Sequence, residues 1–480
     1  MDGRRGMHDR LRRVSVAGTA RDRRRRHPPM ARGLPGTGRA DEQRVLTVAP
    51  RRAPDRRRVV VTGVGMITPL GRNARETFER ASQSCSGIDY IRGFDTRGLP
   101  VRIGGEVADQ WIRRPPGGPA AKLEKMASRA IRFMWTAATE AVEQAKLDRI
   151  PDRYRIGVAL GYHGETASLE DLARIFRASD GDGQWEPQRL RQGGYDAFAV
   201  VRRKVDVGPS LVSRVFDCRG PSIGIASACA AGGQAIGEAY RLIRSGRADA
   251  AIAGGCEASL TYVGLSGFIL LKALTERYSA PATASRPFDR KRSGFVISEG
   301  AGALVLEDLV HARDRGAPIL GELLGYGDST DAYRITDIHP QAEGAVLAMV
   351  RAIEDAGIER ADVDYVNAHG TSTVQNDALE TLAVKRVFGA RAGSLPLSSN
   401  KSMLGHTIGA AGAIEAILTL EGIRESVLLP TINYETPDPR CDLDYVPNQA
   451  RPFAHRIALS NSFGFGGHNA SVCIGAYEDC

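Results

Sequence analysis

The stretch Ser222–Ala239 reads SIGIASACAAGGQAIGEA and places one cysteine, Cys229, where a strand-like segment gives way to a helix-like one. The first N–H groups of a helix are unpaired and, together with the helix dipole, they favour an anion. We therefore expect the pKa of the Cys229 thiol to be lowered and the residue to be a nucleophile. Buried inert cysteines are common, and Cys256 and Cys473, in apolar strand-like settings, are assigned to that class.

A second stretch, Leu395–Ala416, repeats the strand, the loop and the helix of small residues. Ala141–Gly161 and Ala352–Gly370 form another matched pair, each with a helix end, an acidic connection and a strand that finishes in glycine. The helix before the first of these strands has apolar residues at helical spacing: Ile131, Met134, Trp135, Ala138 and Val142. Alternating helices and strands predict parallel sheets that are buried on both faces. Two matches in the same order indicate a duplicated α/β domain.

The second half of the chain supplies chemical partners for the cysteine. His369 follows a predicted strand in VNAHGTSTVQNDALET, and Lys401 and His406 precede a helix of small residues in SSNKSMLGHTIGAAGAIE. Active sites of α/β proteins gather at such strand ends. The turn SNSFGFGGHNAS (Ser460–Ser471) is rich in glycine, and its backbone N–H groups are suited to an oxyanion.

The segment RRVVVTGVGMITPLG (Arg57–Gly71) predicts a buried strand followed by a glycine-rich loop. Its glycines do not have the spacing of a dinucleotide-binding loop, and Pro69 stands where a helix would have to begin. A dinucleotide cofactor is therefore not expected.

The net charge of +9 comes from one end of the chain. Residues 1–58 hold 18 arginines and six acidic residues, a balance of +12, whereas the remaining 47 basic and 50 acidic residues balance at −3. Residues 1–56 are rich in arginine, proline and glycine and are expected to be a disordered leader. A polyanion-binding segment, a transit peptide and an extension without function remain alternatives. The even balance elsewhere argues against a nucleic-acid partner.

Seven scattered cysteines suggest neither a disulfide framework nor a zinc site, and they fit a reducing cytoplasm. The longest apolar runs, such as Gly267–Leu271, are too short to cross a bilayer, and no secretory signal is recognisable. We expect no metal and no membrane association.

Together these motifs resemble the β-ketoacyl-[acyl-carrier-protein] synthases of the KAS I/II type, in the thiolase superfamily. The resemblance covers about Arg57 to Ala476. It implies a duplicated α/β fold arranged as a five-layered αβαβα sandwich, with halves at residues 57–310 and 311–480. It also implies decarboxylative condensation of an acyl thioester with malonyl carrier protein, in fatty-acid or type II polyketide biosynthesis.

The resemblance further implies a role for each site residue. Cys229 would carry the acyl group, and His369 and His406 would hold the malonyl thioester and promote its decarboxylation. Lys401 and Glu415 would support the second histidine, and the N–H groups of Cys229 and Phe465 would bind the oxyanion. The remaining assignments are substrate contacts, at Thr371, Thr373 and Phe463, and a gating ring at Phe465. No cofactor is implied, because the substrates travel on the phosphopantetheine of an acyl carrier protein.

Three segments depart from the family's usual pattern: Gly161–Asp171, the irregular run Arg177–Asp196, and Arg334 in place of a frequent histidine. They leave the substrate and the pathway open, so a specialised polyketide or polyene pathway competes with fatty-acid elongation. The partner could be a second copy or a chain-length-factor-like subunit. A biosynthetic thiolase, a chain-initiating synthase and a non-catalytic chain-length factor are weaker alternatives, because Cys229, His369 and His406 are all present.

Overall fold

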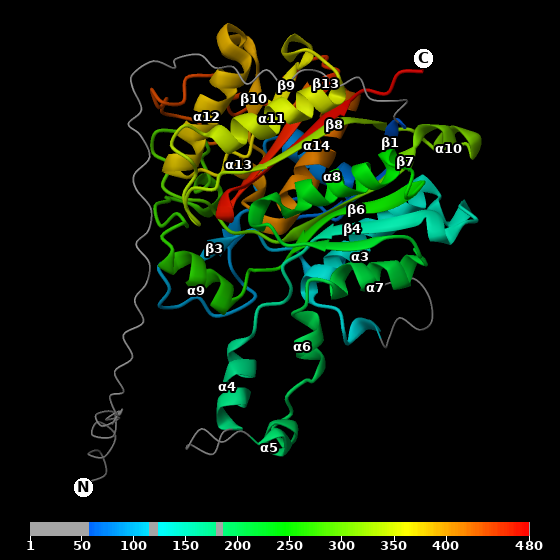
Figure 1. Cartoon of the computed structure of the whole chain (residues 1–480). Coiled ribbons are helices and arrows are strands. Elements are labelled where there is room, and N and C mark those ends of the chain that lie inside the picture. Colours follow the sequence, from blue (N-terminus) through cyan, green and yellow to red (C-terminus); the bar gives the residue numbers. More distant parts are fainter. Residues whose placement is uncertain (1–56, 115–122, 179–185, 480) are drawn as a thin grey trace, which may run out of the picture. The chain divides into compact units, whose positions relative to one another are not determined.

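Ten strands form one mixed sheet in the order β10-β9-β13-β14-β8-β1-β7-β6-β4-β5 (Figure 1). The computed structural model describes residues 57–114, 123–178 and 186–479, so the predicted leader (residues 1–56) lies outside the described residues. The strands are β1 (Val59–Ile67), β4 (Ile156–Gly161), β5 (Ser222–Ile225), β6 (Ala250–Glu257), β7 (Gly300–Asp308), β8 (Gly321–Thr330), β9 (Tyr365–Asn367), β10 (Leu397–Ser398), β13 (Ile457–Gly464) and β14 (His468–Gly475).

The sheet consists of two five-stranded halves with one topology. If the strands of each half are numbered as they occur in the chain, both halves have the spatial order 3-2-4-5-1. A short antiparallel pairing of Val59–Val61 with Gly321–Leu323 joins the halves. The predicted duplication is therefore confirmed. The predicted half boundary at residue 310 falls in α10 (Leu309–Asp314), between β7 and β8, and stays a prediction.

The expectation of purely parallel sheets is wrong. β4 pairs in parallel with β5 and β6, but β7 runs antiparallel to both β6 and β1. The second half repeats this, with β14 antiparallel to β13 and β8. A continuous apolar run reports burial on both faces of a strand, and it carries no information about strand direction.

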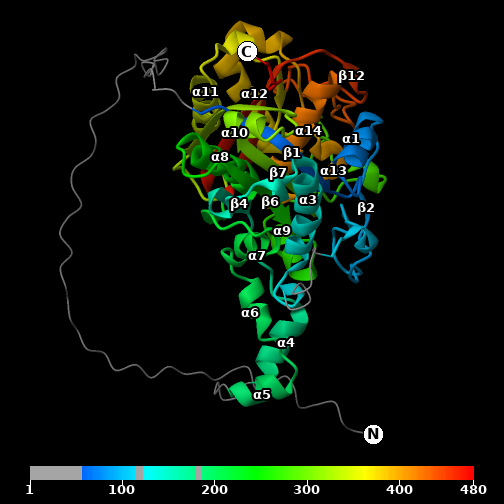
Figure 2. The ribbon, with the colours of Figure 1, turned by 90° about the vertical axis from the view of Figure 1, so that its right-hand side faces the viewer.

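Helices cover both faces of each half and make five layers (Figures 1 and 2). The outer helices of the first half are α3 (Arg129–Ala145) and α7 (Val207–Phe216), and those of the second half are α11 (Glu343–Ala356) and α12 (Val374–Phe388). Between the halves lie α8 (Ala231–Arg244) and α14 (Ala411–Glu425), each in contact with strands of both. This is the five-layered αβαβα arrangement that the family resemblance implies.

The glycines of β1 allow α3 to pack directly on the sheet. A Cβ on Gly63 or Gly65 would collide with the carbonyl oxygens of Ala141 and Ala137. β1 continues through both glycines to Ile67, so the predicted loop does not begin where the glycines do. Their role is close helix packing, which explains why they lack the spacing of a cofactor loop.

Small residues also bring the two central helices together. A Cβ on Gly232 would lie 2.8 Å from the carbonyl oxygen of Gly409, and one on Gly412 would lie 2.6 Å from the backbone nitrogen of Gly233. Cys229 and His406 lie two and five residues before these helices, so the close approach of the helices brings the two side chains together.

Three helices lie beyond the sheet, between β4 and α7: α4 (Leu169–Arg177), α5 (Pro187–Gln192) and α6 (Phe198–Arg202) (Figures 1 and 2). We call α4, α5 and α6 the arm. The run Arg177–Asp196, which the sequence marks as irregular, falls in the arm. Among its described residues, Arg177 ends α4 and Pro187–Gln192 form α5, so the expectation is corrected there to short helices. The remaining elements are α1 (Ala74–Ser82), β2 (Asp89–Tyr90), β3 (Ile103–Gly104), α9 (Tyr262–Leu270), α13 (Lys401–Leu404), β11 (Val427–Leu428) and β12 (Arg451–Pro452).

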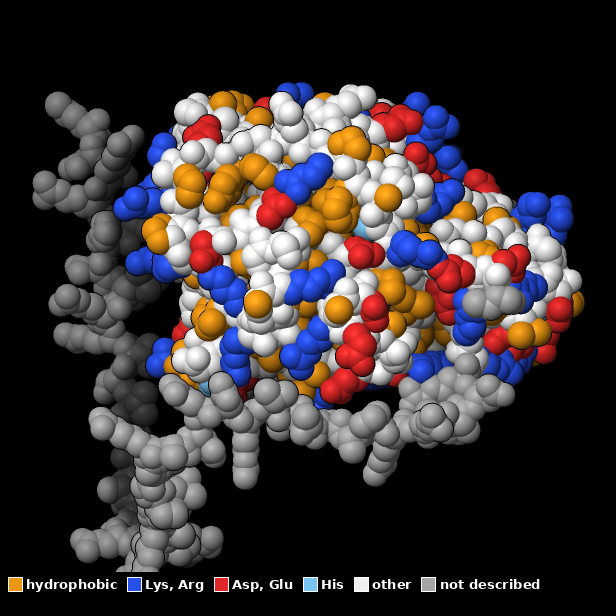
Figure 3. Space-filling view, turned by 90° about the horizontal axis from the view of Figure 1, so that it is seen from above, with side chains coloured by type: hydrophobic (Ala, Val, Ile, Leu, Met, Phe, Trp, Pro, Cys, Tyr) orange, Lys and Arg blue, Asp and Glu red, His pale blue; other side chains and the backbone are white. Residues whose placement is uncertain are grey.

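Basic and acidic side chains are interspersed over the face shown in Figure 3. This distribution agrees with the nearly even charge balance after residue 58. Among the described residues, no helix is both long and apolar enough to span a bilayer.

Candidate active site

A cavity of about 370 Å³ opens between the two halves and reaches the cysteine singled out by the sequence. Seven of the nine predicted site residues line it: Cys229, His369, Thr371, Thr373, His406, Phe463 and Phe465. The other two, Lys401 and Glu415, lie behind it. Residues separated by more than 200 positions in the chain therefore meet in one site.

Cys229 lies in a single 3-10 turn, Ala228–Ala230, that leads directly into α8. The preceding residue, Ala228, has a left-handed backbone with φ of 49°. The turn before α14 has the same feature, at Ile408 with φ of 43°. Non-glycine residues adopt this conformation only when the surrounding structure holds them there, and such positions are concentrated at functional sites.

The pKa of the Cys229 thiol is raised to about 12, mainly because the side chain is buried. The positive charge of Lys401 and the backbone N–H groups of Phe465 and Cys229 act in the opposite direction. The expected lowering of this pKa is thus wrong, because loss of hydration outweighs the helix terminus. The backbone N–H groups of Cys229 and Phe465 lie close enough to the sulfur to lower this pKa, and their role as an oxyanion site stays a prediction.

His406 Nε2 lies 3.0 Å from Cys229 Sγ. The other ring nitrogen, Nδ1, accepts the backbone N–H of Ile408 at 3.2 Å. The ring of Phe295 meets the imidazole edge to face, with centroids 5.2 Å apart. Burial and the nearby charge of Lys401 lower the pKa of His406 well below its ordinary value, so the ring is neutral at pH 7.

His369 lies beside His406, with ring centroids 5.4 Å apart. Its backbone N–H and that of Gly370 donate to the two carboxylate oxygens of Glu380, at 2.8 and 2.7 Å. Burial, Lys401 and His406 lower the pKa of His369 well below its ordinary value. The site therefore contains two neutral imidazoles, each of which can donate one hydrogen bond.

Lys401 and Glu415 form a buried ion pair directly behind the histidines. Burial raises the pKa of Glu415 to about 7, although Lys401 opposes this shift. The charge of Lys401 lowers the pKa values of Cys229, His369 and His406. The pair thus acts on the site through its field.

Two aromatic rings and two hydroxyls complete the predicted set. Phe463 meets the ring of His369 at a centroid distance of 5.8 Å, and Phe465 lines the same cavity. The hydroxyl oxygens of Thr371 and Thr373 lie 3.0 Å apart on the cavity wall. These positions agree with the substrate contacts expected from the sequence, while their roles stay predictions.

The sulfur of Cys229 and one nitrogen each of His369 and His406 lie within 4.8 Å of one another. Cysteine and histidine can bind a metal as a set of three, but a Zn²⁺ site requires bonds of about 2.0–2.3 Å to each ligand. The sulfur and His406 already contact each other directly. The absence of a metal stays a prediction.

Two residues that lie near the site, but do not line its cavity, were not predicted. Glu380 lies 11 residues after His369, and its only sequence signal is an acidic residue on a helix with buried neighbours. His163 follows β4 as His369 follows β9, and its Nδ1 lies 2.9 Å from the buried carboxylate of Glu257. Duplication of the fold could have pointed to His163. The matched segments, however, show only that strands and helices recur, and they carry no information on side-chain contacts.

The sequence matches two family descriptions in succession. These are "Beta-ketoacyl synthase, N-terminal domain" over residues 56–312 and "Beta-ketoacyl synthase, C-terminal domain" over residues 320–435. The 3-oxoacyl-[acyl-carrier-protein] synthase 2 of Synechocystis sp. is 40% identical over 430 residues, which are 88% of this chain and 99% of that protein. The enzyme of the same name from Coxiella burnetii is 39% identical over 430 residues, 88% of this chain and all of that protein.

Solved structures show the same fold. A type II polyketide ketosynthase in complex with its acyl-carrier protein has a TM-score of 0.77 at 33% identity. The ishigamide ketosynthase/chain length factor has a TM-score of 0.78 at 34% identity. In both comparisons 88% of this chain and 100% of the other chain are covered. The matches agree with the site. The chain is an acyltransferase that catalyses the condensation carried out by 3-oxoacyl-[acyl-carrier-protein] synthases, and it belongs to the beta-ketoacyl synthase family.

Proposed function

We propose that Cys229 accepts an acyl group and that His369 and His406 direct the decarboxylation of the malonyl unit that extends it. The observation that carries this assignment is the convergence of one thiol and two neutral imidazoles in one cavity. In the first step the sulfur of Cys229 attacks the carrier thioester. The carrier thiol leaves with a proton, and an acyl thioester remains on Cys229.

In the second step malonyl carrier protein binds with its thioester oxygen at the two imidazoles. Loss of CO₂ leaves an enolate, and the N–H donors of His369 and His406 stabilise its negative oxygen. The enolate carbon attacks the acyl carbon on Cys229, and the tetrahedral oxyanion lies at the backbone N–H groups of Cys229 and Phe465. The cysteine sulfur then leaves and regains a proton, and the product is two carbons longer.

The alternative functions lack support at the site. A thiolase would need a second cysteine, but Cys473 is fully buried in β14 and does not line the cavity. A non-catalytic chain-length factor would not need a thiol beside two histidines. The pathway is proposed at the level of fatty-acid or type II polyketide biosynthesis.

We further propose that the carrier protein docks at the mouth of the cavity, where its phosphopantetheine arm has direct access to Cys229. Leu271, Ile335 and Val374 line the mouth and are exposed, and Lys272 adds a positive charge there. Lys272→Glu should raise the KM for carrier-bound substrates and leave alkylation of Cys229 by iodoacetamide unchanged. An unchanged KM would place the carrier elsewhere.

The acyl chain is proposed to run from Cys229 toward the arm. Cys229 packs in an apolar cluster with Leu260, Leu265 and Ile408. Leu260 also lines a second cavity of about 390 Å³, which extends to Leu169 of α4. If the acyl chain extends from Cys229 past Leu260 into the second cavity, Leu260→Trp should shorten the longest acyl product seen by mass spectrometry.

A second subunit, either another copy or a chain-length-factor-like protein, is proposed to pair with β5. This strand is at the edge of the sheet, and its residues are exposed or half-buried. The nearby arm exposes Leu169 and Phe176, the latter to 79%. Phe176→Lys should weaken the dimer in light scattering, whereas Val310→Lys, at an exposed site on α10, should not.

The cytoplasm is the proposed location, since all six described cysteines are free thiols. The direct test of the proposed function is mass spectrometry of the protein and of carrier-bound products. Incubation with acyl carrier protein should add the acyl mass to Cys229, and malonyl carrier protein should then yield the 3-oxoacyl product. Absence of a mass increase at Cys229 would disprove the assignment.

A further inference from the structure

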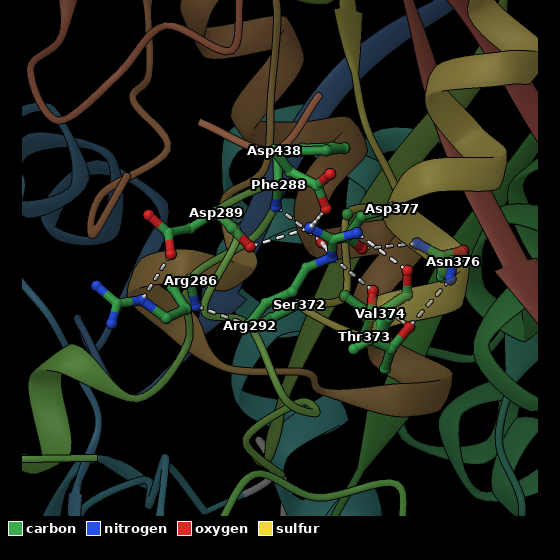
Figure 4. A network of polar contacts seen from close by, with 12 residues as sticks. Arg286, Phe288, Asp289, Arg292, Ser372, Thr373, Val374, Asn376, Asp377 and Asp438 are labelled. Carbon is green, nitrogen blue, oxygen red and sulfur yellow. Dashed lines mark hydrogen bonds and ion pairs between the residues drawn. The ribbon is translucent and has the colours of Figure 1, made fainter. Parts of the chain in front are cut away.

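Arg292 contacts the segment Thr373–Val374 (Figure 4), and its side chain is 1% exposed. Thr371 and Thr373 of this loop line the cavity. Its Nε donates to the carbonyl oxygen of Thr373 at 3.0 Å, and Nη2 donates to that of Val374 at 3.0 Å. Nη1 donates to the carbonyl oxygen of Asp289 at 3.0 Å and to the Asp438 carboxylate at 2.7 Å. One guanidinium thus ties its own segment to two others that are distant in the chain.

Two buried carboxylates balance the charge of Arg292. Asp438 accepts a direct hydrogen bond, and the carboxylate of Asp377 lies 3.6 Å from Nε. Asp377 also accepts the backbone N–H of Phe288 at 2.8 Å. The planar fork of arginine can reach two carbonyl groups and a carboxylate at once, which the single ammonium group of lysine cannot do.

The threonine loop depends on such outside support. Ser372, between the two threonines, has a left-handed backbone with φ of 69°. Its carbonyl oxygen accepts the N–H of Gly294, and its hydroxyl accepts the N–H of Arg286. Ser293 and Gly294, next to Arg292, line the same cavity. The segment around Arg292 and the threonine loop are therefore parts of one assembly.

We propose that Arg292 is a positioning residue, which holds the hydroxyls of Thr371 and Thr373 where the phosphopantetheine arm of a carrier-bound substrate must pass. This inference rests on the proposed function, because it assumes that the two threonines contact that arm. Arg292 itself does not line the cavity, so it acts through the carbonyl groups of Thr373 and Val374. Loss of the guanidinium's hydrogen bonds should weaken binding of the phosphopantetheine and leave Cys229, His369 and His406 in place.

The test is a double-variant cycle with Arg292→Lys and Thr373→Ala. Arg292→Lys should raise the KM for malonyl carrier protein about tenfold, the equivalent of one lost hydrogen bond to a charged group. Its kcat and the rate of Cys229 alkylation by iodoacetamide should stay within about twofold of the parent, since neither depends on how tightly the phosphopantetheine is bound. In the Thr373→Ala background, Arg292→Lys should raise KM by a smaller factor than in the parent, because one of the two hydroxyls that Arg292 positions is already gone and coupled residues are not additive.

The matched control is Arg315→Lys. Arg315 is also a largely buried arginine that binds a buried carboxylate, that of Glu307, together with a backbone carbonyl, and it does not line the cavity. This control should leave KM unchanged even where it lowers the melting temperature. If Arg292→Lys does not fold, Asp438→Asn, which weakens the ion pairs of this carboxylate with Arg292 and with Arg440, should give the same KM-only change.

Two failures can be told apart. A raised KM in Thr373→Ala together with a parental KM in Arg292→Lys would overturn the role of Arg292 alone, as would equal KM factors in both backgrounds. A parental KM in Thr373→Ala would instead overturn the threonine contact in the proposed function.

Discussion

The Nε2 atom of His406 lies 3.0 Å from the sulfur of Cys229, while its Nδ1 accepts the backbone N–H of Ile408. A neutral imidazole carries one proton, and an Nδ1 that accepts a hydrogen bond leaves that proton on Nε2. His406 therefore donates toward the cysteine. This tautomer suits an imidazole that binds a carbonyl or enolate oxygen, and it does not suit a base that removes the thiol proton.

Removal of either histidine should separate acylation from condensation. His369→Ala and His406→Ala should still gain the acyl mass on Cys229 but lose about 10²–10³ in the rate of decarboxylation, the effect of one lost oxyanion donor. Acylation is followed by intact-protein mass spectrometry and decarboxylation by release of CO₂ from malonyl carrier protein. A folded His406→Ala variant that decarboxylates at the parental rate would refute the proposed mechanism.

Substitution of the nucleophile should have the opposite effect. Cys229→Ala should abolish condensation, and Cys229→Gln should retain measurable decarboxylation, because both imidazoles remain. Condensation and CO₂ release are measured on the same preparations. Substantial condensation by Cys229→Ala would show that another residue carries the acyl group.

Disruption of the buried ion pair should destabilise the protein. Lys401→Met leaves the buried carboxylate of Glu415 without its partner, which costs about 3–5 kcal/mol in comparable pairs. The double variant Lys401→Met/Glu415→Leu removes both charges and should recover most of the free energy of unfolding, as measured by urea denaturation. Activity should not recover with it, since the field of Lys401 at the histidines is lost. Full activity of the folded double variant would argue against that electrostatic role.

The pH dependence of stability should report the neutral histidines. Since the folded-state pKa of His406 lies well below 6.5, the unfolded chain binds a proton below pH 6.5 that the folded chain does not. The contribution of His406 to stability is thus present above pH 6.5 and is lost as the pH falls toward its folded-state pKa, by up to about 1.4 kcal/mol per pH unit.

The comparison with His406→Gln isolates this effect. Buried carboxyls with raised pKa values, such as Glu380 and Glu415 at about 7, change stability in the opposite direction over the same range. Both carboxyls are present in the parent and in His406→Gln, so their contributions cancel when the two free energies of unfolding are subtracted. Between pH 7.5 and 5.5, the parent should lose more free energy of unfolding than His406→Gln; equal losses would show that His406 is not held neutral.

Strand β1 shows what a local sequence pattern can and cannot predict. Three β-branched residues predict the strand correctly, but the prediction of a loop at the glycines after them is wrong. In the folded chain Gly63 and Gly65 remain in the strand, because they allow α3 to approach the sheet. Glycine favours turns in an isolated chain, and only the neighbouring helix shows that close packing is its purpose here.

The thiol of Cys229 illustrates the same limit for chemistry. Its place before a helix could be read from the residue order, and that order predicted a lowered pKa. Burial raises the pKa instead, because desolvation depends on every residue packed around the sulfur.

Residue order alone was enough to predict the duplicated α/β architecture and to single out Cys229, His369 and His406, which the folded chain brings into one cavity. These features are carried by local order: strand, turn, helix, and a reactive side chain at a strand end. Strand direction, the protonation of the site and the supports behind it, such as Glu380 and Arg292, could be learned only from the folded chain. Those properties arise from contacts between segments far apart in the chain, where burial and hydrogen-bond geometry are set by the packing of the whole fold.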